Sequence, residues 1–303
     1  MTVLKNDENR NNDKTVGAVL SKGARILTDA GIENAKAEAR YLMAQYRDTD
    51  IATLYSELYA QLDDFTAMRF MKAIKKRATH YPFQYILGFT YFLEYKFICR
   101  EKVLIPRFDT ENLVMHALEM SPAKGQNVLD MCTGSGCIGI SYYLTRLKEG
   151  YKDNVTLSDI SPDALRLAED NARGNDADVT VVESDLFEAF KNEDGSPAVK
   201  FDMILSNPPY IRTKDIYNLI KDVRDFEPRL ALDGEADGLG FYRRIIKEAP
   251  DFLTDEGVLI FEIGSEEYMD VQDMMLDAGF RDIKRLKDMS GLDRVVSGIY
   301  KER

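Results

Sequence analysis

The amino-acid sequence predicts an α/β protein in which a mostly parallel, doubly wound sheet follows a small helical-bundle domain. From residue 127 onward, short apolar runs alternate with segments of helical periodicity. Residues 15–80 instead carry apolar side chains at helical spacing and contain few β-branched runs. Alternation of strands and helices is typical of a parallel sheet, whereas helical spacing alone indicates a bundle.

Shifts in composition divide the chain into four parts. Residues 1–14 are polar and rich in Asn and Asp, without the apolar core of a signal peptide. Residues 15–80 form the expected helical domain, and residues 107–303 form the expected sheet domain. Between them, residues 81–106 concentrate aromatic side chains around Gly88, which predicts a linker made of one or two β-hairpins.

The expected strands of the sheet are short apolar runs. They are residues 128–129, 155–157, 179–182, 203–205, 258–263, 283–286 and 295–300. The helices between them are expected around residues 138–147, 164–172, 242–249 and 269–278. The last two runs lie close together, which predicts a hairpin at one edge of the sheet.

Charge and composition exclude several classes of function. With 40 Lys and Arg against 52 Asp and Glu, the net charge is −12, which argues against direct nucleic-acid binding and suits a protein partner with a basic face. The three cysteines form no C-x-x-C pattern, so they predict neither disulfides nor a metal site. No apolar run approaches the ~20 residues of a membrane helix, and we expect a cytoplasmic protein.

The first expected strand runs directly into small residues, in the order Asp130-Met131-Cys132-Thr133-Gly134-Ser135-Gly136. Small residues between a strand and a helix let the backbone approach a ligand closely, with helix N–H groups directed at it. The full glycine pattern of a dinucleotide site is not present, because Cys132 stands at its first glycine position. An ordinary glycine turn is the alternative interpretation.

Acidic side chains end the next two strands. Asp159 can accept hydrogen bonds from both hydroxyls of a ribose, since Ser161 already supplies the cap of the following helix. Asp185 can accept a hydrogen bond from an adenine amino group, and Leu186 and Phe187 can cover the face of the ring. Glycines follow the first strand and acidic residues follow the next two, and these three neighbouring strand ends together predict a single cofactor site.

The fourth strand is followed by Ser206-Asn207-Pro208-Pro209-Tyr210. The prolines remove two backbone donors, which leaves the Asn207 side-chain oxygen and the Pro208 carbonyl as acceptors. Two rigid acceptors match an NH2 group, and Tyr210 adds a flat face for a planar group. Asn207, Pro208 and Tyr210 are the expected catalytic residues, and with Pro209 they form the expected substrate-binding set. A plain Pro-Pro turn is the alternative.

Together these segments resemble the class I S-adenosylmethionine-dependent methyltransferases. The resemblance implies a Rossmann-like sheet of seven strands whose last strand is antiparallel. It also implies that Cys132 to Gly136 wraps the methionine part of S-adenosylmethionine, that Asp159 holds the ribose, and that Asp185 with Leu186 borders the adenine. The implied cofactor-binding residues are Asp130, Cys132, Thr133, Gly134, Ser135, Gly136, Asp159, Asp185, Leu186 and Asn207.

Further segments are similar to the HemK-like family of release-factor glutamine methyltransferases, over nearly the whole chain past Lys14. They are Pro82–Gly88, Val103–Glu111, Ser184–Glu188, Glu227–Leu232, Asp237–Leu239 and Gly291–Val296, with Phe108 in place of the usual proline. The resemblance implies methylation of N5 of the glutamine in the Gly-Gly-Gln motif of peptide chain release factors, which modulates translation termination. The helical domain would then recognise the release factor.

The Asn-Pro-Pro-Tyr motif alone does not select the substrate, since it is also similar to that of N6-adenine and N2-guanine methyltransferases. A ribosomal-protein glutamine methyltransferase, a nucleic-acid base methyltransferase and an inactive binding module are therefore alternatives. Arg107 and Glu111 are expected near the mouth of the cleft, or in a salt bridge at a helix start. Residues 211–239 are expected to form a wall or lid, or a solvated insertion.

Overall fold

The computed structural model describes residues 14–122 and 124–302, so the polar tail lies outside the described residues except for Lys14. The chain divides into two compact units, Met1–Leu87 and Gly88–Arg303, and each is described by itself. The boundary between them falls inside the aromatic-rich segment of residues 81–106. No helix within the described ranges combines the length and the apolar character needed to cross a membrane.

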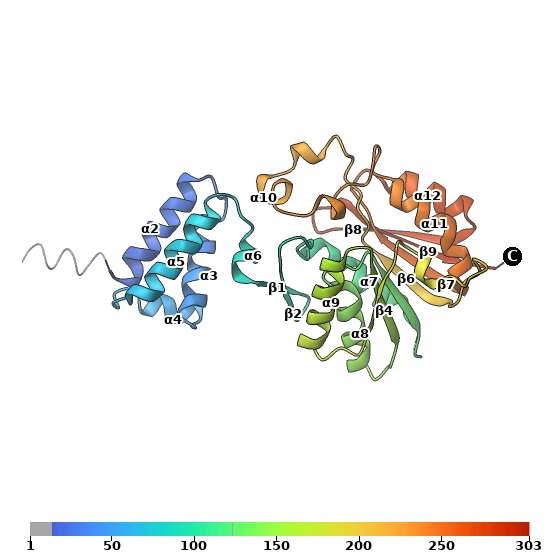
Figure 1. Ribbon diagram of the computed structural model, residues 1–303, viewed down its shortest axis with the longest axis horizontal. Coiled ribbons are helices and arrows are strands. Elements are labelled where there is room, and N and C mark those ends of the chain that lie inside the picture. The colour runs from blue at the N-terminus through green and yellow to red at the C-terminus, as the bar shows by residue number, and fades with distance from the viewer. Residues whose placement is uncertain (1–13, 123, 303) are drawn as a thin grey trace, which may run out of the picture. The chain divides into compact units, whose positions relative to one another are not determined.

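The first unit is a bundle of helices (Figure 1). They are α2 (Val16–Asp29), α3 (Ala35–Tyr46), α4 (Ile51–Ser56), α5 (Asp64–Arg77) and the short α6 (Phe83–Leu87). Three of them begin at a side chain that accepts a hydrogen bond from the first turn, namely Thr15, Asp50 and Asp63. The apolar faces meet in one core that includes Leu27 and Phe70.

Residues 81–106, all of them described, hold one hairpin, and their first part is helical. Phe83–Leu87 forms α6 where the sequence predicts β structure, and Pro82 favours this because its fixed φ suits the start of a helix. Gly88, with φ of +82°, then turns the chain into the hairpin. The hairpin strands are β1 (Phe89–Phe92) and β2 (Tyr95–Ile98). Because Phe92 and Phe97 are buried in the core of the second unit, the hairpin is part of that unit.

The second unit is built on a seven-stranded sheet of order β5-β4-β3-β6-β7-β9-β8 (Figure 1). Its strands are β3 (Asn127–Met131), β4 (Asn154–Asp159), β5 (Thr180–Glu183), β6 (Phe201–Ser206), β7 (Leu253–Glu262), β8 (Phe280–Lys287) and β9 (Asp293–Tyr300). Its α-helices are α7 (Glu111–Met120), α8 (Cys137–Lys148), α9 (Pro162–Gly174), α10 (Lys221–Arg224), α11 (Gly240–Phe252) and α12 (Tyr268–Asp277). Only β9 runs antiparallel, to both β7 and β8. The predicted sheet, its antiparallel last strand and its edge hairpin are confirmed.

Helices cover both faces of this sheet. Helices α7, α8 and α9 pack on one face, and α11 and α12 pack on the other (Figure 1). Successive residues of β3 show the division, because Val128 belongs to the core of the first face and Leu129 to the core of the second. Burial on both faces explains why the strands read as continuous apolar runs.

The direction of strand addition changes between β3 and β6. From β3 the chain adds β4 and β5 on one side, and it then returns to place β6 on the other side. The loops that follow β3 and β6 therefore diverge and leave a crevice at the carboxyl ends, where open α/β sheets bind ligands. The segments Asp130–Gly136 and Asn207–Tyr210 follow these two strands.

Candidate active site

A pocket with a volume of about 580 Å³ opens at the carboxyl ends of the central strands. The predicted residues that line it are Cys132, Thr133, Gly134, Ser135, Asp159, Asp185, Leu186, Asn207 and Pro209. The predicted residues that are not part of this lining are Asp130, Gly136, Pro208 and Tyr210. Its volume falls within the range of about 300–1,000 Å³ that is typical of small-molecule sites.

The loop after β3 passes through the left-handed region three times. Cys132, Gly134 and Gly136 have φ values of +59°, +56° and +81°. Glycine adopts these values without steric cost, whereas the Cβ of Cys132 is strained. The Thr133 N–H group donates to the Ser158 carbonyl at 2.9 Å and ties the loop to β4. Cysteine in place of the usual glycine therefore leaves the turn intact and adds strain to it.

Asp130 lies fully buried beneath this loop. Its Oδ2 accepts hydrogen bonds from the Thr133 hydroxyl at 2.5 Å and from the Gly139 N–H group at 2.9 Å. Its Oδ1 is buried and accepts no hydrogen bond from the described residues. Burial raises the pKa of Asp130 to about 7, although both hydrogen bonds lower it. Asp130 therefore holds the loop against α8, whereas the sequence predicted a cofactor contact.

Asp159 ends β4 and lines the pocket. Its Oδ2 accepts from the Gly134 N–H group and its Oδ1 from the Ser161 N–H group, both at 2.9 Å. Burial raises the pKa of Asp159, and these backbone donors lower it. Each carboxylate oxygen offers two lone pairs, so one on each oxygen is left for a ligand. Ser161 also caps α9, as the sequence predicts.

Asp185 and Leu186 follow β5 and line the pocket. The carboxylate of Asp185 accepts a hydrogen bond from the Arg244 guanidinium at 2.7 Å. The predicted role of Phe187 over an adenine ring is wrong, because Phe187 is fully buried and stacks on Phe252 with ring centroids 4.4 Å apart. The chain turns at Leu186, where φ is +52°, and directs the following side chain into the core.

The Asn-Pro-Pro-Tyr motif begins directly after β6. Asn207 and Pro209 line the pocket, and Pro208 is buried. The Asn207 Nδ2 atom donates to the Thr110 hydroxyl at 3.3 Å. Asn207 Oδ1 accepts no hydrogen bond from the residues that the structure describes. An amide oxygen without a protein donor therefore stands at the pocket wall.

Tyr210 is held behind this wall. Its hydroxyl donates to Glu262 Oε1 at 3.2 Å, and burial, together with the charge of Glu262, raises the pKa of Tyr210. A Cβ added at Gly234 would lie 2.6 Å from the Tyr210 Cα, so the two backbones are in close contact. The Tyr210 ring is not part of the pocket lining, and its predicted packing face is therefore not presented to the pocket in this structure.

Thr110, Glu262 and Arg244 also build the site, although the sequence analysis assigns a role to none of them. Thr110 and Arg244 line the pocket, and Glu262 ends β7. The sequence does carry a signal for Glu262, since it stands near the end of a predicted strand beside the other acidic strand ends. No group of three metal-ligating side chains occurs among the described residues.

The four basic side chains that line the pocket are each paired with a carboxylate. The pairs are Lys102–Asp163 at 3.5 Å, Arg107–Glu227 at 2.5 Å, Arg229–Asp233 at 3.0 Å and Arg244–Asp185 at 2.7 Å. The Glu227 side chain is only 1% exposed, so its pair with Arg107 ties the segment of residues 211–239 to the pocket. Residues 228–231 of that segment form part of the wall. Glu111 instead accepts from the Leu93 N–H group at 2.7 Å, outside the lining.

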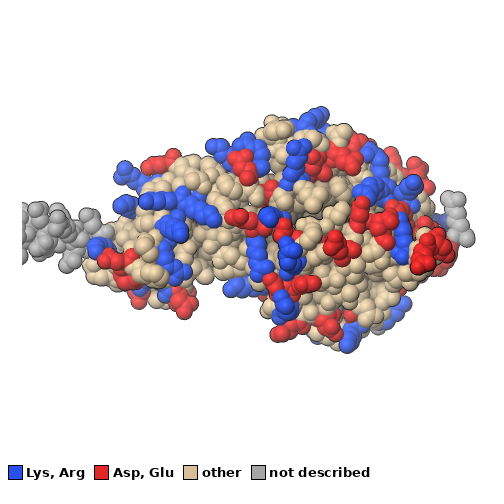
Figure 2. Space-filling model, in the orientation of Figure 1, with Lys and Arg blue, Asp and Glu red and all other residues tan. Residues whose placement is uncertain are grey.

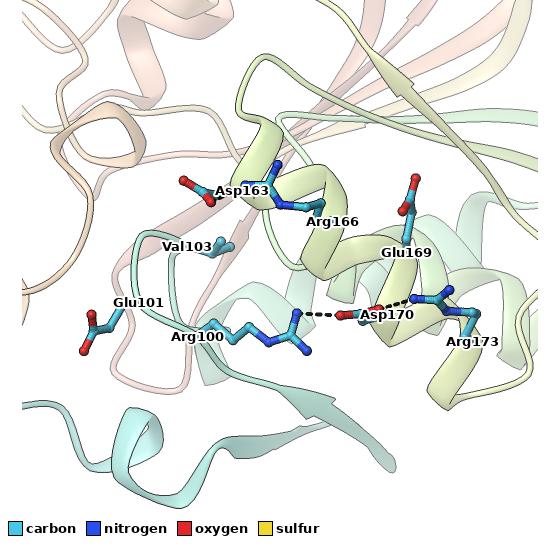
Figure 3. Close-up of a pocket in the computed structure, with 8 residues that line it drawn as sticks. All are labelled: Arg100, Glu101, Val103, Asp163, Arg166, Glu169, Asp170 and Arg173. Atoms are coloured by element: carbon cyan, nitrogen blue, oxygen red, sulfur yellow. Dashed lines mark hydrogen bonds and ion pairs between the residues drawn. The ribbon is translucent and has the colours of Figure 1, made fainter.

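A second hollow, with a volume of about 270 Å³, lies beside α9 (Figure 3). The Asp170 carboxylate lies between the guanidinium groups of Arg100 and Arg173 and pairs with both (Figure 3). Arg166 pairs with Asp163 at 2.5 Å. Because these guanidinium groups already have carboxylate partners, the hollow is a surface ion-pair network.

Models of two families match the chain. Residues 18–88 match the PrmC N-terminal domain, and residues 107–226 match the Methyltransferase small domain. A solved structure of similar fold is the 16S rRNA N2 G1207 methyltransferase of T. thermophilus in complex with AdoMet and guanosine. Its TM-score is 0.51 at 16% identity, over 70% of this chain and 50% of that chain, so the likeness concerns the fold.

Curated proteins named release factor glutamine methyltransferase are similar over nearly the full length. That of Geobacter sulfurreducens is 38% identical over 284 residues, which cover 94% of this chain and 96% of the relative. That of Moorella thermoacetica is 37% identical over 286 residues, covering 92% and 96%. That of Bacillus subtilis is 33% identical over 293 residues, covering 94% and 98%. As its motifs predict, this chain belongs to the release factor glutamine methyltransferase family.

Proposed function

We propose that this chain transfers the methyl group of S-adenosylmethionine to the side-chain amide nitrogen, N5, of the glutamine in the Gly-Gly-Gln motif of peptide chain release factors. The observation that carries the proposal is the free oxygen of the Asn207 amide, which borders the same pocket as the loops after β3 and β4. The names of the curated relatives support the substrate, and the matched methyltransferase domain supports the reaction. A substrate that acts in translation implies a cytoplasmic location.

S-adenosylmethionine fits the chemistry of the pocket. The turns from Cys132 to Gly136 bring backbone close to the cavity, where the methionine part would lie. The unused lone pairs of Asp159 suit the two ribose hydroxyls. Leu186 offers an apolar side chain for the adenine, and Asp185 offers an acceptor that it shares with Arg244. These residues, with Asn207, are the proposed cofactor site.

The proposed catalytic role of the motif is to hold and align the substrate nitrogen. An amide nitrogen is a weak nucleophile because its lone pair is delocalised, as a rotation barrier of about 18–20 kcal/mol indicates. Hydrogen bonds from its two N–H groups to Asn207 Oδ1 and the Pro208 carbonyl would bias the nitrogen toward pyramidal geometry. Rigid alignment of reacting groups can lower a barrier by roughly 7–11 kcal/mol.

The same two acceptors stabilise the charge that develops during transfer. Bound S-adenosylmethionine supplies an electrophilic methyl group. As the nitrogen gains positive charge, the oxygens of Asn207 and Pro208 would stabilise the N–H groups that donate to them. The new N–C bond would form as the bond between the sulfonium sulfur and the methyl carbon breaks, with S-adenosylhomocysteine as the leaving group, and the surplus proton would then leave to solvent. No side chain therefore needs to act as a general base before transfer.

The charges beside the pocket favour a protein substrate over a nucleic-acid base. A nucleic acid would need cationic side chains free to bind its phosphates. Each of the four basic side chains of the lining instead has a carboxylate partner. On the face of the second unit visible in Figure 2, acidic and basic side chains are intermixed.

For the first unit we propose recognition of the release factor. Helix α5 exposes Phe65 and Met68, which are three residues apart and so share one face of the helix. Nearby in the sequence, Tyr59 is 92% exposed. Grouped apolar side chains on a surface are typical of protein interaction sites.

The test is incubation of the protein with radiolabelled S-adenosylmethionine and, separately, release factor, ribosomal protein and RNA. We expect label in the release factor and none in a release factor whose Gly-Gly-Gln glutamine is replaced by alanine. Asn207→Ala should abolish transfer while cofactor binding, measured by calorimetry, is largely retained, because Asn207 is one of several residues of the proposed cofactor site. Label that appears only in RNA or only in ribosomal protein would refute the proposal. Undiminished turnover by Asn207→Ala would contradict the role of Asn207 as a hydrogen-bond acceptor.

A further inference from the structure

The prolines of the Asn-Pro-Pro-Tyr motif cannot fix their own backbone by donating hydrogen bonds. Pro208 and Pro209 have no N–H group, so neither can donate to a neighbouring segment. The acceptors of the motif must nevertheless keep their places, because a displacement of about 1 Å can lower a rate about a hundredfold. The motif therefore depends on contacts that other parts of the chain make with it.

Hydrogen bonds join the residues directly after the motif to residues 232–235. The Ile211 N–H group donates to the Leu232 carbonyl at 3.0 Å, and the Gly234 N–H group donates back to the Ile211 carbonyl at 2.8 Å. Two residues further on, the Thr213 N–H group donates to the Glu235 carbonyl at 2.9 Å. The two segments run parallel here, and the end of the motif is thereby fixed to the second of them.

Two glycines of that second segment bring its backbone against the motif itself. A Cβ added at Gly234 would lie 2.6 Å from the Tyr210 Cα and 2.8 Å from the Pro209 carbonyl oxygen. A Cβ added at Gly238 would lie 2.5 Å from the Tyr210 carbonyl oxygen. Carbon atoms in contact lie about 3.5–4.0 Å apart, so alanine at position 234 would push the two backbones apart by roughly 1 Å. Glycine at both positions therefore makes the contact possible.

The segment that carries these glycines is itself anchored at both ends. The buried Glu227 pairs with Arg107 before it, and at its other end the chain continues into α11, which packs on the sheet. Between these ends, Asp233 accepts from the Thr213 hydroxyl at 2.6 Å and pairs with Arg229 at 3.0 Å. A segment held at several points resists displacement, so it can hold the motif in place.

We propose that Gly234 and Gly238 are positioning residues, which let residues 232–238 lie directly against the motif and keep its two acceptor oxygens in register with the methyl donor. This inference rests on the proposed function, because it concerns the acceptors of the same site. Neither glycine lines the pocket, so each acts through the backbone of the motif.

The first test is Gly234→Ala. We expect kcat to fall about a hundredfold, because the added Cβ displaces the motif by roughly 1 Å. The Kd of S-adenosylmethionine, measured by calorimetry, should change little, because most of the proposed cofactor residues lie in other loops. A raised KM for release factor with an unchanged kcat would show that the segment serves only as a wall of the pocket, and it would overturn the proposal.

Gly125→Ala is the matched control. A Cβ added at Gly125 would lie 2.7 Å from the Lys152 carbonyl oxygen, at the amino ends of β3 and β4. Neither Gly125 nor Gly234 has a left-handed φ, so the two variants differ mainly in where the overlap lies. We expect Gly125→Ala to lower the melting temperature but to keep kcat. Equal losses of kcat in the two variants would identify general loosening of the sheet domain and overturn the proposal.

A second pair of variants separates overlap from backbone strain. Gly238 and Gly195 have φ values of +83° and +82°, so alanine is strained at both. Nothing lies within 4 Å of a Cβ added at Gly195, whereas Gly238 faces the Tyr210 carbonyl. We expect Gly238→Ala to lower kcat tenfold or more and Gly195→Ala to leave it unchanged. The same kcat in both variants would overturn the role of Gly238.

Thr213→Val tests the same contact if alanine at position 234 prevents folding. It nearly keeps the volume of the side chain and removes only the hydroxyl that donates to Asp233. We expect kcat to fall about twofold to tenfold, the rate change equivalent to one hydrogen bond. An unchanged kcat in Thr213→Val would contradict the anchoring of the segment.

Wild-type protein is assayed beside the variants with the same release factor. Absence of transfer by the wild type would refute the proposed function. Transfer by the wild type together with unaffected variants would refute the positioning role alone.

Discussion

At position 132 a glycine variant should be more stable than an alanine variant, which is the reverse of the order found at ordinary positions. At ordinary positions glycine destabilises a protein by about 0.5–1 kcal/mol relative to alanine, because it is freer in the unfolded chain. At a φ of +59° the Cβ of any other residue is strained, at a cost of about 1–2 kcal/mol. Both variants lose the same thiol, so the contribution of that group cancels between them. We therefore expect Cys132→Gly to be more stable than Cys132→Ala by roughly 1 kcal/mol.

Ser141 provides the matched control. It is fully buried in the middle of α8, where the backbone is helical, so Ser141→Ala should be more stable than Ser141→Gly by about 1 kcal/mol. The free energy of unfolding of all four variants is measured by urea unfolding, followed by circular dichroism. The transition of the second unit is identified as the one that S-adenosylmethionine shifts to a higher urea concentration. An alanine variant at position 132 as stable as the glycine variant would refute the strain at this turn.

Three further predictions concern the cofactor, the substrate and pH. Asp159→Asn should raise the Kd of S-adenosylmethionine roughly tenfold or more in calorimetry, because hydrogen bonds to a charged acceptor contribute about 1.5–3 kcal/mol; an unchanged Kd would remove the ribose role. Phe65→Ser combined with Met68→Ser should raise the KM for release factor without lowering kcat, and an unchanged KM would count against α5 as the docking helix. The native pKa of Asp130, about 7, lies above its unfolded value, so the native state binds the proton more tightly. Without cofactor, the free energy of unfolding should therefore fall as pH rises from about 4 to about 7, and it should fall less in Asp130→Asn. The same pH dependence of the free energy of unfolding in both proteins would contradict this prediction.

The sheet could be predicted from the sequence because its strands are buried on both faces. Runs such as residues 203–205 are then continuously apolar, and the helices between them keep their own period. The structure of Phe83–Leu87 was harder to predict, because aromatic side chains favour strands. Pro82 at the start of the segment and packing against the core of the bundle favour a helix instead. The prediction that Phe187 covers the adenine ring was wrong because of the local backbone. Leu186 is left-handed, and this one residue directs the Phe187 side chain into the core, where it stacks on Phe252.

The candidate site was predictable where function requires a particular residue at a strand end. Asp159, Asp185 and Asn207 all line the pocket, as their positions after successive strands indicate. Thr110 was not predictable, because its contact with Asn207 joins residues 97 positions apart in the chain. Its hydroxyl belongs to a short turn before α7 that carries no periodic pattern.

Four carboxylates stand at or just beyond the carboxyl ends of parallel strands, namely Asp130, Asp159, Asp185 and Glu262. Exposure separates them into two pairs. Asp130 and Glu262 are 0% and 2% exposed, and hydroxyl or backbone donors of neighbouring segments are held against them. Asp159 and Asp185 line the pocket, and their oxygens keep lone pairs that a ligand can reach. A buried carboxylate holds in place the protein groups that donate to it, whereas an accessible carboxylate can accept hydrogen bonds from a ligand. Burial therefore decides whether an acidic residue at a strand end positions other protein groups or binds a ligand.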